Sequence, residues 1–297
     1  MTTPGAIGDI CGKTVLVTGA SSGIGLSACE ALAERGARLI MVGRSPDKTE
    51  AAAARVRDRT PDASVEVELC DLARLDDIRA LGRRLRARLD HLDVLLNNAG
   101  AMHTTRKETA DGFEMTYGVN HLGYFLPTLA LLPLLEAAPA ARIVNVASDA
   151  HRAAKLDLDD LQMDRRGYSS WTAYGTSKLL NILFTRELAR RLEGTAITAN
   201  SLHPGVVKTG FAHNDPGWMS AAWKLFSVFQ ISAASGAETS VYLCADPSVV
   251  GVSGRYFAKC RERAPRSTAT RDDDALRLWE LSASQVGLPA EGLPVPA

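Results

Sequence analysis

Residues 14–25 read TVLVTGASSGIG, a β-branched run that leads through a glycine-rich turn into a helical pattern. Glycine allows a tight turn and lets a phosphate approach bare backbone. The start of the following helix offers unpaired N–H groups and the positive end of the helix dipole. The spacing is GxxxGxG, which differs from the best-known GxGxxG fingerprint. Its place between a strand and a helix predicts a site for a dinucleotide pyrophosphate, formed by Gly19, Ser21, Ser22, Gly23, Ile24 and Gly25.

Short apolar runs alternate with longer helical stretches along the chain. Strands are predicted at Thr14–Thr18, Arg38–Val42, Ser64–Cys70, Asp93–Leu96, Arg142–Ala147, Ala196–Leu202 and Arg255–Phe257. Helices are predicted at Gly23–Arg35, Asp47–Arg59, Leu75–Leu89, Asp111–Leu135, Thr172–Leu192 and Ser235–Cys244. This alternation predicts an α/β Rossmann fold, a doubly wound parallel sheet of about seven strands in the order 3-2-1-4-5-6-7, with helices on both faces.

The alternation runs unbroken, so we predict a single dinucleotide-binding domain over residues 12–260. A flexible N-terminus is expected at residues 1–11, and a C-terminal extension with a mobile tail at residues 261–297. Within that extension, the charged stretch Arg261–Asp274 predicts a solvated loop.

The composition excludes several classes of protein. Thirty-four Lys and Arg residues balance 34 Asp and Glu residues, so no global field favours nucleic acid or an anionic membrane. The five cysteines are scattered without a CxxC pair, which predicts neither a disulfide framework nor a metal site. The N-terminal residues lack signal-peptide features, and the longest apolar stretch, Tyr124–Leu135, is too short to span a bilayer. We therefore expect a cytoplasmic protein without a membrane span.

A rival interpretation of the glycine-rich turn is the nucleophile elbow of a serine hydrolase. Residues 19–23 fit G-x-S-x-G, and Ser21 would be the nucleophile. Such an elbow follows earlier strands and an oxyanion loop, for which there is no room before Thr14. The order of elements therefore favours the dinucleotide site.

The end of the second predicted strand indicates which dinucleotide binds. An NAD site usually has a carboxylate there, which bonds the ribose hydroxyls. This chain has Gly43 and Arg44 instead, with the first acidic residue at Asp47. A guanidinium can pair with a 2′-phosphate, so Arg44 favours NADP(H) over NAD(H). The alternative is an ordinary surface arginine beside an NAD site that backbone groups complete.

Four polar residues suggest acid–base chemistry when they are taken together. Tyr174 and Lys178 lie one helical turn apart on one face of a predicted helix. A neighbouring ammonium favours the phenolate and is expected to lower the pKa of Tyr174. Ser148 follows a strand, where it can bond a substrate oxygen, and Asn120 lies inside a predicted helix. The nearby Asp149 and His151 are expected to be loop residues, facing the substrate if anything, and not members of a triad with Ser148.

These motifs, in this order, resemble the classical short-chain dehydrogenase/reductase family. The resemblance rests on Thr18–Gly25, Asn97–Gly100, Asn120, Ser148, Tyr174 with Lys178, and Pro204–Thr209, and it covers roughly residues 12–257. Longer stretches such as Lys178–Leu192 are similar to the retinol-dehydrogenase-like branch. The resemblance implies an oxidoreductase that transfers a hydride between NADP(H) and an alcohol, aldehyde or ketone.

The resemblance also implies roles for individual residues. Tyr174 would be the catalytic acid/base, Lys178 would hold the nicotinamide ribose, Ser148 would orient the substrate oxygen, and Asn120 would support a proton path. The expected cofactor contacts, besides the glycine-rich turn, Arg44 and the Tyr174/Lys178 pair, are Asp71, Leu72, Asn98, Ala99, Gly100, Val207 and Thr209.

The substrate side is expected near residues 205–235, which resemble the family's lid. Its bulky apolar residues, such as Trp218 and Trp223, suit a small lipophilic substrate, but a helix packed on the body or on another subunit would look the same. The resemblance also implies a homo-oligomer, a dimer or tetramer, although monomers occur in the longer branch of the family. A third hypothesis is a redox sensor that binds the nucleotide without turnover, although a sensor has no need of the Tyr174/Lys178 pair.

Overall fold

The computed structural model describes residues 10–205 and 232–289. Within these residues, one eight-stranded sheet has the order β3-β2-β1-β4-β5-β6-β7-β8, and only the last pair, β7 with β8, is antiparallel. The strands are β1 (Thr14–Thr18), β2 (Arg38–Gly43), β3 (Val65–Leu69), β4 (Val94–Asn97), β5 (Ala141–Val146), β6 (Ile197–His203), β7 (Tyr256–Ala258) and β8 (Arg261–Glu262). The predicted doubly wound sheet is confirmed, with one short strand added at its edge.

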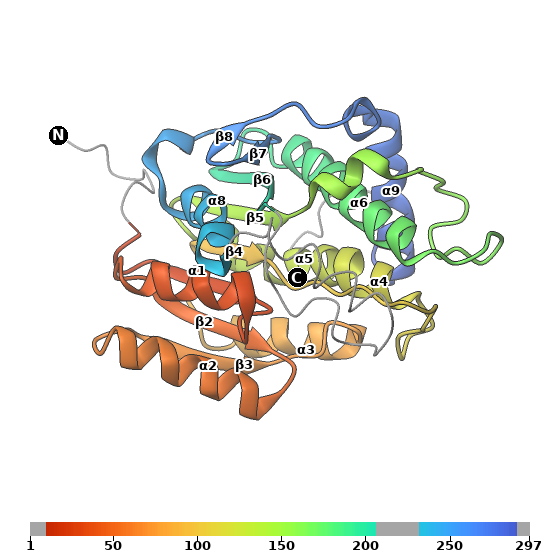
Figure 1. Ribbon diagram of the computed structural model, residues 1–297. Coiled ribbons are helices and arrows are strands. Elements are labelled where there is room, and N and C mark those ends of the chain that lie inside the picture. Colours follow the sequence, from red (N-terminus) through yellow and green to blue (C-terminus); the bar gives the residue numbers. More distant parts are fainter. Residues whose placement is uncertain (1–9, 206–231, 290–297) are drawn as a thin grey trace.

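Helices cover both faces of this sheet (Figure 1). The described helices are α1 (Gly23–Ala33), α2 (Pro46–Arg59), α3 (Leu75–Arg86), α4 (Met115–Tyr117), α5 (Gly123–Glu136), α6 (Ser170–Arg191), α8 (Ala233–Ala245) and α9 (Asp272–Gln285). Shorter turns are the π-helical η1 (Gly118–Leu122) and the 3-10 turns η2 (Asp149–Ala153), η5 (Pro247–Val249) and η6 (Ser267–Thr270).

The alternation of side chains along each strand divides the core in two. Val15 and Val17 of β1 face one cluster with apolar residues of α1, α2 and α8, whereas Leu16 faces a second cluster with α3, α5, α6 and α9. Both faces of β1 are fully buried. A parallel sheet covered on both faces requires such apolar strands, and for this reason the first strand could be predicted from the sequence.

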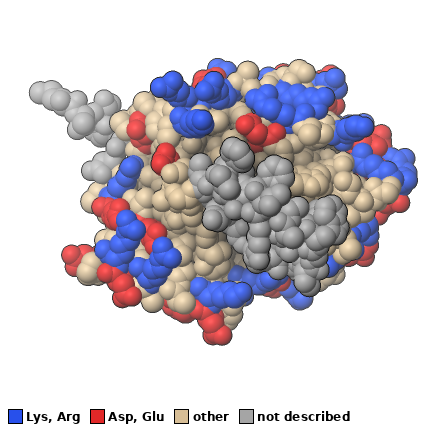
Figure 2. Space-filling view, in the orientation of Figure 1, with Lys and Arg blue, Asp and Glu red and all other residues tan. Residues whose placement is uncertain are grey.

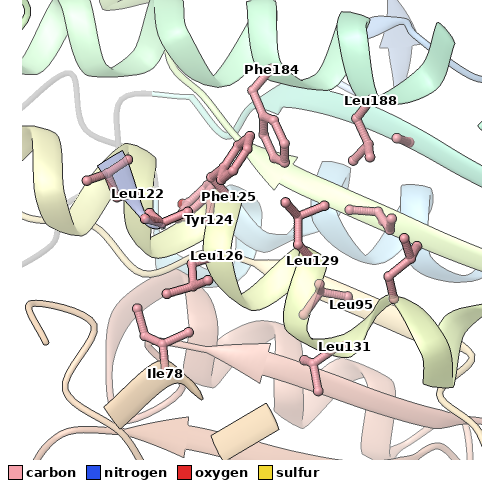
Figure 3. Close-up of a cluster of buried hydrophobic side chains, with 14 of the residues drawn as sticks. Ile78, Leu95, Leu122, Tyr124, Phe125, Leu126, Leu129, Leu131, Phe184 and Leu188 are labelled. Carbon is pink, nitrogen blue, oxygen red and sulfur yellow. The ribbon is translucent and has the colours of Figure 1, made fainter. Parts of the chain in front are cut away.

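In the second cluster, α5 packs against α3 and, through its aromatic side chains, against α6. Figure 3 shows Phe125 and Leu129 of α5 close to Phe184 and Leu188 of α6. The rings of Phe125 and Phe184 lie 5.3 Å apart, and Trp279 of α9 packs edge-on against Phe125 at 5.0 Å. The C-terminal helix is therefore part of the core.

Two predictions about helices were wrong. The stretch Asp111–Leu135 is not one regular helix, because it begins only at Met115 and passes through the π-helical turn η1 before α5. The predicted loop Arg261–Asp274 contains β8 and η6, and α9 begins at Asp272. Three aspartates in the first turn of α9 favour a helix start, because acidic side chains stabilise the positive end of the helix dipole.

The stretch Met115–Glu136 is long and apolar enough to cross a membrane by length and composition. However, 83% of its apolar window is buried inside the fold. Packing against the sheet, α3 and α6 accounts for its apolar character, so it is weak evidence for a membrane span.

A buried histidine joins η1 to the C-terminal helix. His121 has no exposed surface, its ring stacks on Tyr117 at 5.4 Å, and its Nε2 lies 2.8 Å from Ser282 Oγ. Because the Ser282 hydroxyl donates its proton to the Leu278 carbonyl, it accepts from the Nε2–H of His121. Burial lowers the pKa of His121 from 6.5 to about 3, so the ring is neutral in the folded protein.

Replacing Trp279 by Ala is expected to destabilise the protein by about 3–5 kcal/mol, because the change leaves a cavity in the core between α5, α6 and α9. The matched control is Leu276→Ala on the same helix, since Leu276 is 38% exposed. Urea unfolding measures both variants. Equal stability of the two variants would mean that α9 is not an integral part of the core.

His121 is also expected to make stability depend on pH. Its folded pKa is depressed, so below pH 6.5 the unfolded chain binds a proton that the folded chain excludes down to about pH 3. Stability is therefore lost as the pH falls through this window, at up to about 1.4 kcal/mol per pH unit. His121→Gln should remove about 2 kcal/mol of the decrease between roughly pH 7 and pH 5. Urea unfolding of the two proteins at both pH values measures this difference. An equal decrease in the free energy of unfolding for both proteins would contradict this assignment.

Candidate active site

The glycine-rich turn and the end of β4 meet at the carboxyl edge of the sheet. The Thr18 hydroxyl accepts the backbone N–H groups of Asn98 and Ala99 at 3.0 and 3.1 Å. The Asn98 side chain donates back to the Thr18 carbonyl at 2.9 Å. Thr18 therefore joins the two segments, a role that sequence analysis missed.

The turn is built so closely that glycine is required at two positions. A Cβ on Gly19, whose φ is +65°, would lie 2.7 Å from the Ala99 Cα, and a Cβ on Gly25 would lie 2.3 Å from the Gly19 carbonyl oxygen. Helix α1 starts at Gly23, with no acidic side chain in its first turn and no side-chain cap from Ser22. Its first N–H groups are thus not used by a cap, and these residues fit a dinucleotide pyrophosphate.

Among the residues that the structure describes, Ser21 has no histidine as a hydrogen-bond partner. A serine nucleophile needs an adjacent base. Because β1 is also the first strand of the sheet in chain order, the hydrolase interpretation of this turn has no structural support.

The residues expected at the adenine end follow two neighbouring strands. Gly43 of β2 pairs with Leu69 of β3, so Arg44 and Asp71 follow adjacent strand ends. Arg44 is exposed, and its guanidinium makes no ion pair or hydrogen bond to any residue that the structure describes. The Asp71 carboxylate accepts the N–H of Ala73 at 3.0 Å, and Leu72 is buried.

Asn120 lies in the π-helical turn and is completely buried. Its amide oxygen accepts the N–H of Ala101 at 2.7 Å, and its amide nitrogen donates to the Ala101 carbonyl at 2.9 Å and to Ser177 Oγ at 3.0 Å. Ser177 in turn donates to the Tyr174 carbonyl at 2.8 Å. Asn120 thus connects the loop after β4 to the turn of α6 that carries Tyr174.

The structure brings Ser148 and Tyr174 together. Ser148 follows β5 and accepts the N–H of Ala150 at 3.2 Å, and its hydroxyl lies close enough to Tyr174 to lower the pKa of that phenol. This contact needs a close approach of α6 to η2, because a Cβ on Gly175 would lie 2.9 Å from the Ala150 carbonyl oxygen. A glycine directly after Tyr174 therefore brings the two hydroxyl groups within reach.

Lys178 lies behind this pair and is 2% exposed. Its Nζ donates to the Val146 carbonyl at 2.9 Å and lies 5.8 Å from the centre of the Tyr174 ring. Burial lowers the pKa of Lys178 from 10.5 to about 7. Burial also raises the pKa of Tyr174 to about 12, which the hydrogen bond from Ser148 partly opposes. The expected lowering of the Tyr174 pKa by Lys178 is thus not seen, because desolvation raises this pKa by more than the contact with Ser148 lowers it.

His151 was expected to be a loop residue that faces the substrate, and this prediction was wrong, whereas its exclusion from a triad with Ser148 agrees with the structure. It is fully buried in η2, and its two ring nitrogens bond the Ser148 carbonyl and the Arg266 N–H. Both nitrogens are therefore occupied by backbone groups, and a Ser–Asp–His triad is absent from these neighbours. Val207, Thr209 and most of the expected lid lie outside the described residues.

Comparisons with known proteins agree with this geometry. The family model for short-chain dehydrogenases matches residues 13–219. Mouse retinol dehydrogenase 12 is 43% identical over 280 residues, which cover 94% of this chain and 88% of the relative. Human retinol dehydrogenase 13 is 41% identical over 286 residues, which cover 95% of this chain and 86% of the relative.

A solved structure extends the similarity to the whole fold. The crystal structure of an uncharacterised protein from Mycobacterium paratuberculosis is 33% identical, with a TM-score of 0.77, and the match covers 98% of this chain and 99% of that one. The chain therefore belongs to the short-chain dehydrogenase family, in its retinol-dehydrogenase-like branch, and is an NAD(P)-dependent oxidoreductase that acts on CH–OH groups.

Proposed function

We propose that this protein interconverts a lipophilic alcohol and its aldehyde or ketone with NADP(H), and that Tyr174 is the acid/base. The observation that carries the proposal is the close approach of Tyr174 to Ser148, with Lys178 buried beside them and the glycine-rich turn at the same edge of the sheet. Ligands of open α/β sheets bind at the carboxyl ends of the strands, where these residues lie.

Each residue has a defined task in the proposed reduction. A bound nicotinamide supplies the hydride. With a pKa of about 12, Tyr174 carries its proton at neutral pH and can donate it to the carbonyl oxygen of the substrate. Ser148 orients the same oxygen by a hydrogen bond. In the oxidative direction Tyr174 accepts the proton of the substrate alcohol.

Lys178 supports both ligands. One of its three N–H bonds is directed at the Val146 carbonyl, which leaves two donors for the hydroxyls of the nicotinamide ribose. With these ligands in place, its positive charge stabilises the phenolate form of Tyr174. The phenolate is the form that accepts the proton of the alcohol in the oxidative direction.

The preference for NADP(H) rests on Arg44. An exposed guanidinium just after β2, without a partner among residues 10–205 and 232–289, is suited to a bidentate contact with a 2′-phosphate. The strand-end position holds no carboxylate that would repel this phosphate, because the residues before Arg44 are Val42 and Gly43.

The lipophilic substrate class is supported by the relatives and by Trp171. The relatives are named retinol dehydrogenases, and retinol is a lipophilic alcohol. Trp171 lies one helical turn before Tyr174 and is 52% exposed, so it offers an apolar surface near the reacting groups. The cytoplasmic location and the homo-oligomer stay predictions.

Replacing Tyr174 by Phe is expected to lower kcat by at least about 100-fold, because the proton donor is lost. Ser148→Ala should lower kcat to a similar extent, since the substrate oxygen is no longer oriented. Tyr242→Phe on α8 is the matched control, because its hydroxyl bonds Ser248 on an exposed surface. The measurement is NADPH oxidation with a panel of lipophilic aldehydes. Near-normal turnover of Tyr174→Phe, or tight NADPH binding by the native protein without turnover on any carbonyl, would overturn the proposal.

Replacing Arg44 by Ala is expected to weaken NADPH about tenfold, the usual contribution of one charged hydrogen bond, and to leave NADH within about twofold. Arg35→Ala is the control, because Arg35 is an exposed arginine that follows the end of α1, away from the carboxyl edge of the sheet. Fluorescence titration gives both affinities. An equal loss for the two nucleotides would remove the role of Arg44 in choosing between them.

A further inference from the structure

A second buried histidine lies directly behind Ser148. His151 has no exposed surface, and it is held in η2, the turn that Ser148 caps. Its Nδ1 lies 2.7 Å from the Ser148 carbonyl oxygen, and its backbone N–H donates to that same oxygen at 3.1 Å. The Ser148 carbonyl is thus held by two groups of one residue.

The other side of the ring fixes where its proton lies. The backbone N–H of Arg266 donates to His151 Nε2 at 3.1 Å. A backbone N–H can only donate, so Nε2 must offer its lone pair, and the ring proton is on Nδ1. The Nδ1–H therefore donates to the Ser148 carbonyl. Burial lowers the pKa of His151, which keeps the ring in this neutral form.

The segment that supplies Arg266 is itself fastened to η2. The Arg266 guanidinium donates to the carbonyls of Arg152 and Ala154 at 2.7 and 3.0 Å, and Arg152 donates to the Ala264 carbonyl at 2.9 Å. Tyr256 packs edge-on against the His151 ring at 5.2 Å. Residues 264–266 are thus well placed to hold the imidazole against Ser148.

We propose that His151 is a positioning residue, which fixes the Ser148 peptide through its Nδ1–H while the Arg266 N–H holds the ring from the other side. The inference rests on the proposed role of Ser148. The direction of the Ser148 Cα–Cβ bond follows from its backbone, and that backbone is extended, with φ −165° and ψ 154°. Two donors on one carbonyl fix this peptide plane, and a small misplacement of Ser148 Oγ lowers the rate without removing the hydroxyl.

Two substitutions of His151 separate its two bonds. The side-chain amide of Asn places a donor near Nδ1, and that of Gln places an acceptor near Nε2. His151→Asn should therefore keep kcat within about threefold of the native value, whereas His151→Gln should lower kcat about 10- to 100-fold, with the KM for NADPH within about twofold in both. The melting temperature of each variant is measured on the full chain, and the kcat values are compared at a temperature at which both variants are folded.

A second pair tests the bond from Arg266 even if the His151 variants fold poorly. The φ of Arg266 is −64°, the value that proline requires, so Arg266→Pro removes the N–H without backbone strain at that angle. Arg266→Ala removes only the guanidinium. We expect a lower kcat for Arg266→Pro than for Arg266→Ala, by about tenfold.

The outcomes distinguish this inference from the proposed function. Equal kcat for His151→Asn and His151→Gln, together with equal kcat for Arg266→Pro and Arg266→Ala, would overturn the positioning role even when Ser148→Ala is inactive. Full turnover of Ser148→Ala would instead refute the role of Ser148 on which the inference rests. The expected pattern is an inactive Ser148→Ala and a selective loss of kcat in His151→Gln and Arg266→Pro.

Discussion

The bond from the buried Lys178 ammonium to the Val146 carbonyl is the interaction on which the active-site geometry depends. A charge removed from water costs several kcal/mol unless it finds partners. The structure provides a carbonyl oxygen at 2.9 Å and the faces of Tyr124 and Tyr174 at 5.3 and 5.8 Å. The compensation is incomplete, because burial still lowers the pKa of Lys178 to about 7. A perturbed lysine in such a place is typical of a functional site, since an apolar residue would be more stable there.

A network of buried amides and hydroxyls holds the elements around Lys178 in register. Asn97 of β4 donates to Asn145 of β5 at 2.9 Å and to Thr128 of α5 at 3.0 Å, and Asn145 donates to Thr185 of α6 at 2.9 Å. Apolar contacts tolerate sliding of a helix over a sheet, whereas hydrogen bonds of this kind are directional. The network therefore fixes the positions of α5 and α6 along the strands. It thereby also fixes the positions of Asn120, which precedes α5, and of Tyr174 on α6.

Much of this arrangement was predictable from local patterns, and the exceptions have physical reasons. The bounds of β1 to β7 were predicted to within one residue at each end, because most of these strands are buried and apolar, whereas the two-residue strand β8 was taken for a loop. The π-helical turn around Asn120 was not, because it is a single turn inside an otherwise helical stretch and no local sequence pattern marks it. Helix α9 was missed although Ala275, Leu278 and Trp279 have helical spacing, because its aspartates were taken for loop residues. The direction of the Tyr174 pKa depends on burial, which no local pattern reveals.

The missed C-terminal segment has the larger consequence. It contributes none of the proposed site residues, yet Ser282 accepts a hydrogen bond from His121, beside Asn120, and Arg266 donates one to His151, near Ser148. The two histidines use opposite tautomers, with the proton on Nε2 in His121 and on Nδ1 in His151, and each tautomer is dictated by the C-terminal partner. These contacts span 161 and 115 residues of sequence, so they form only when the domain is complete. The docked C-terminal segment thus holds both of the turns that carry Asn120 and Ser148, so the order of the site depends on a segment outside it.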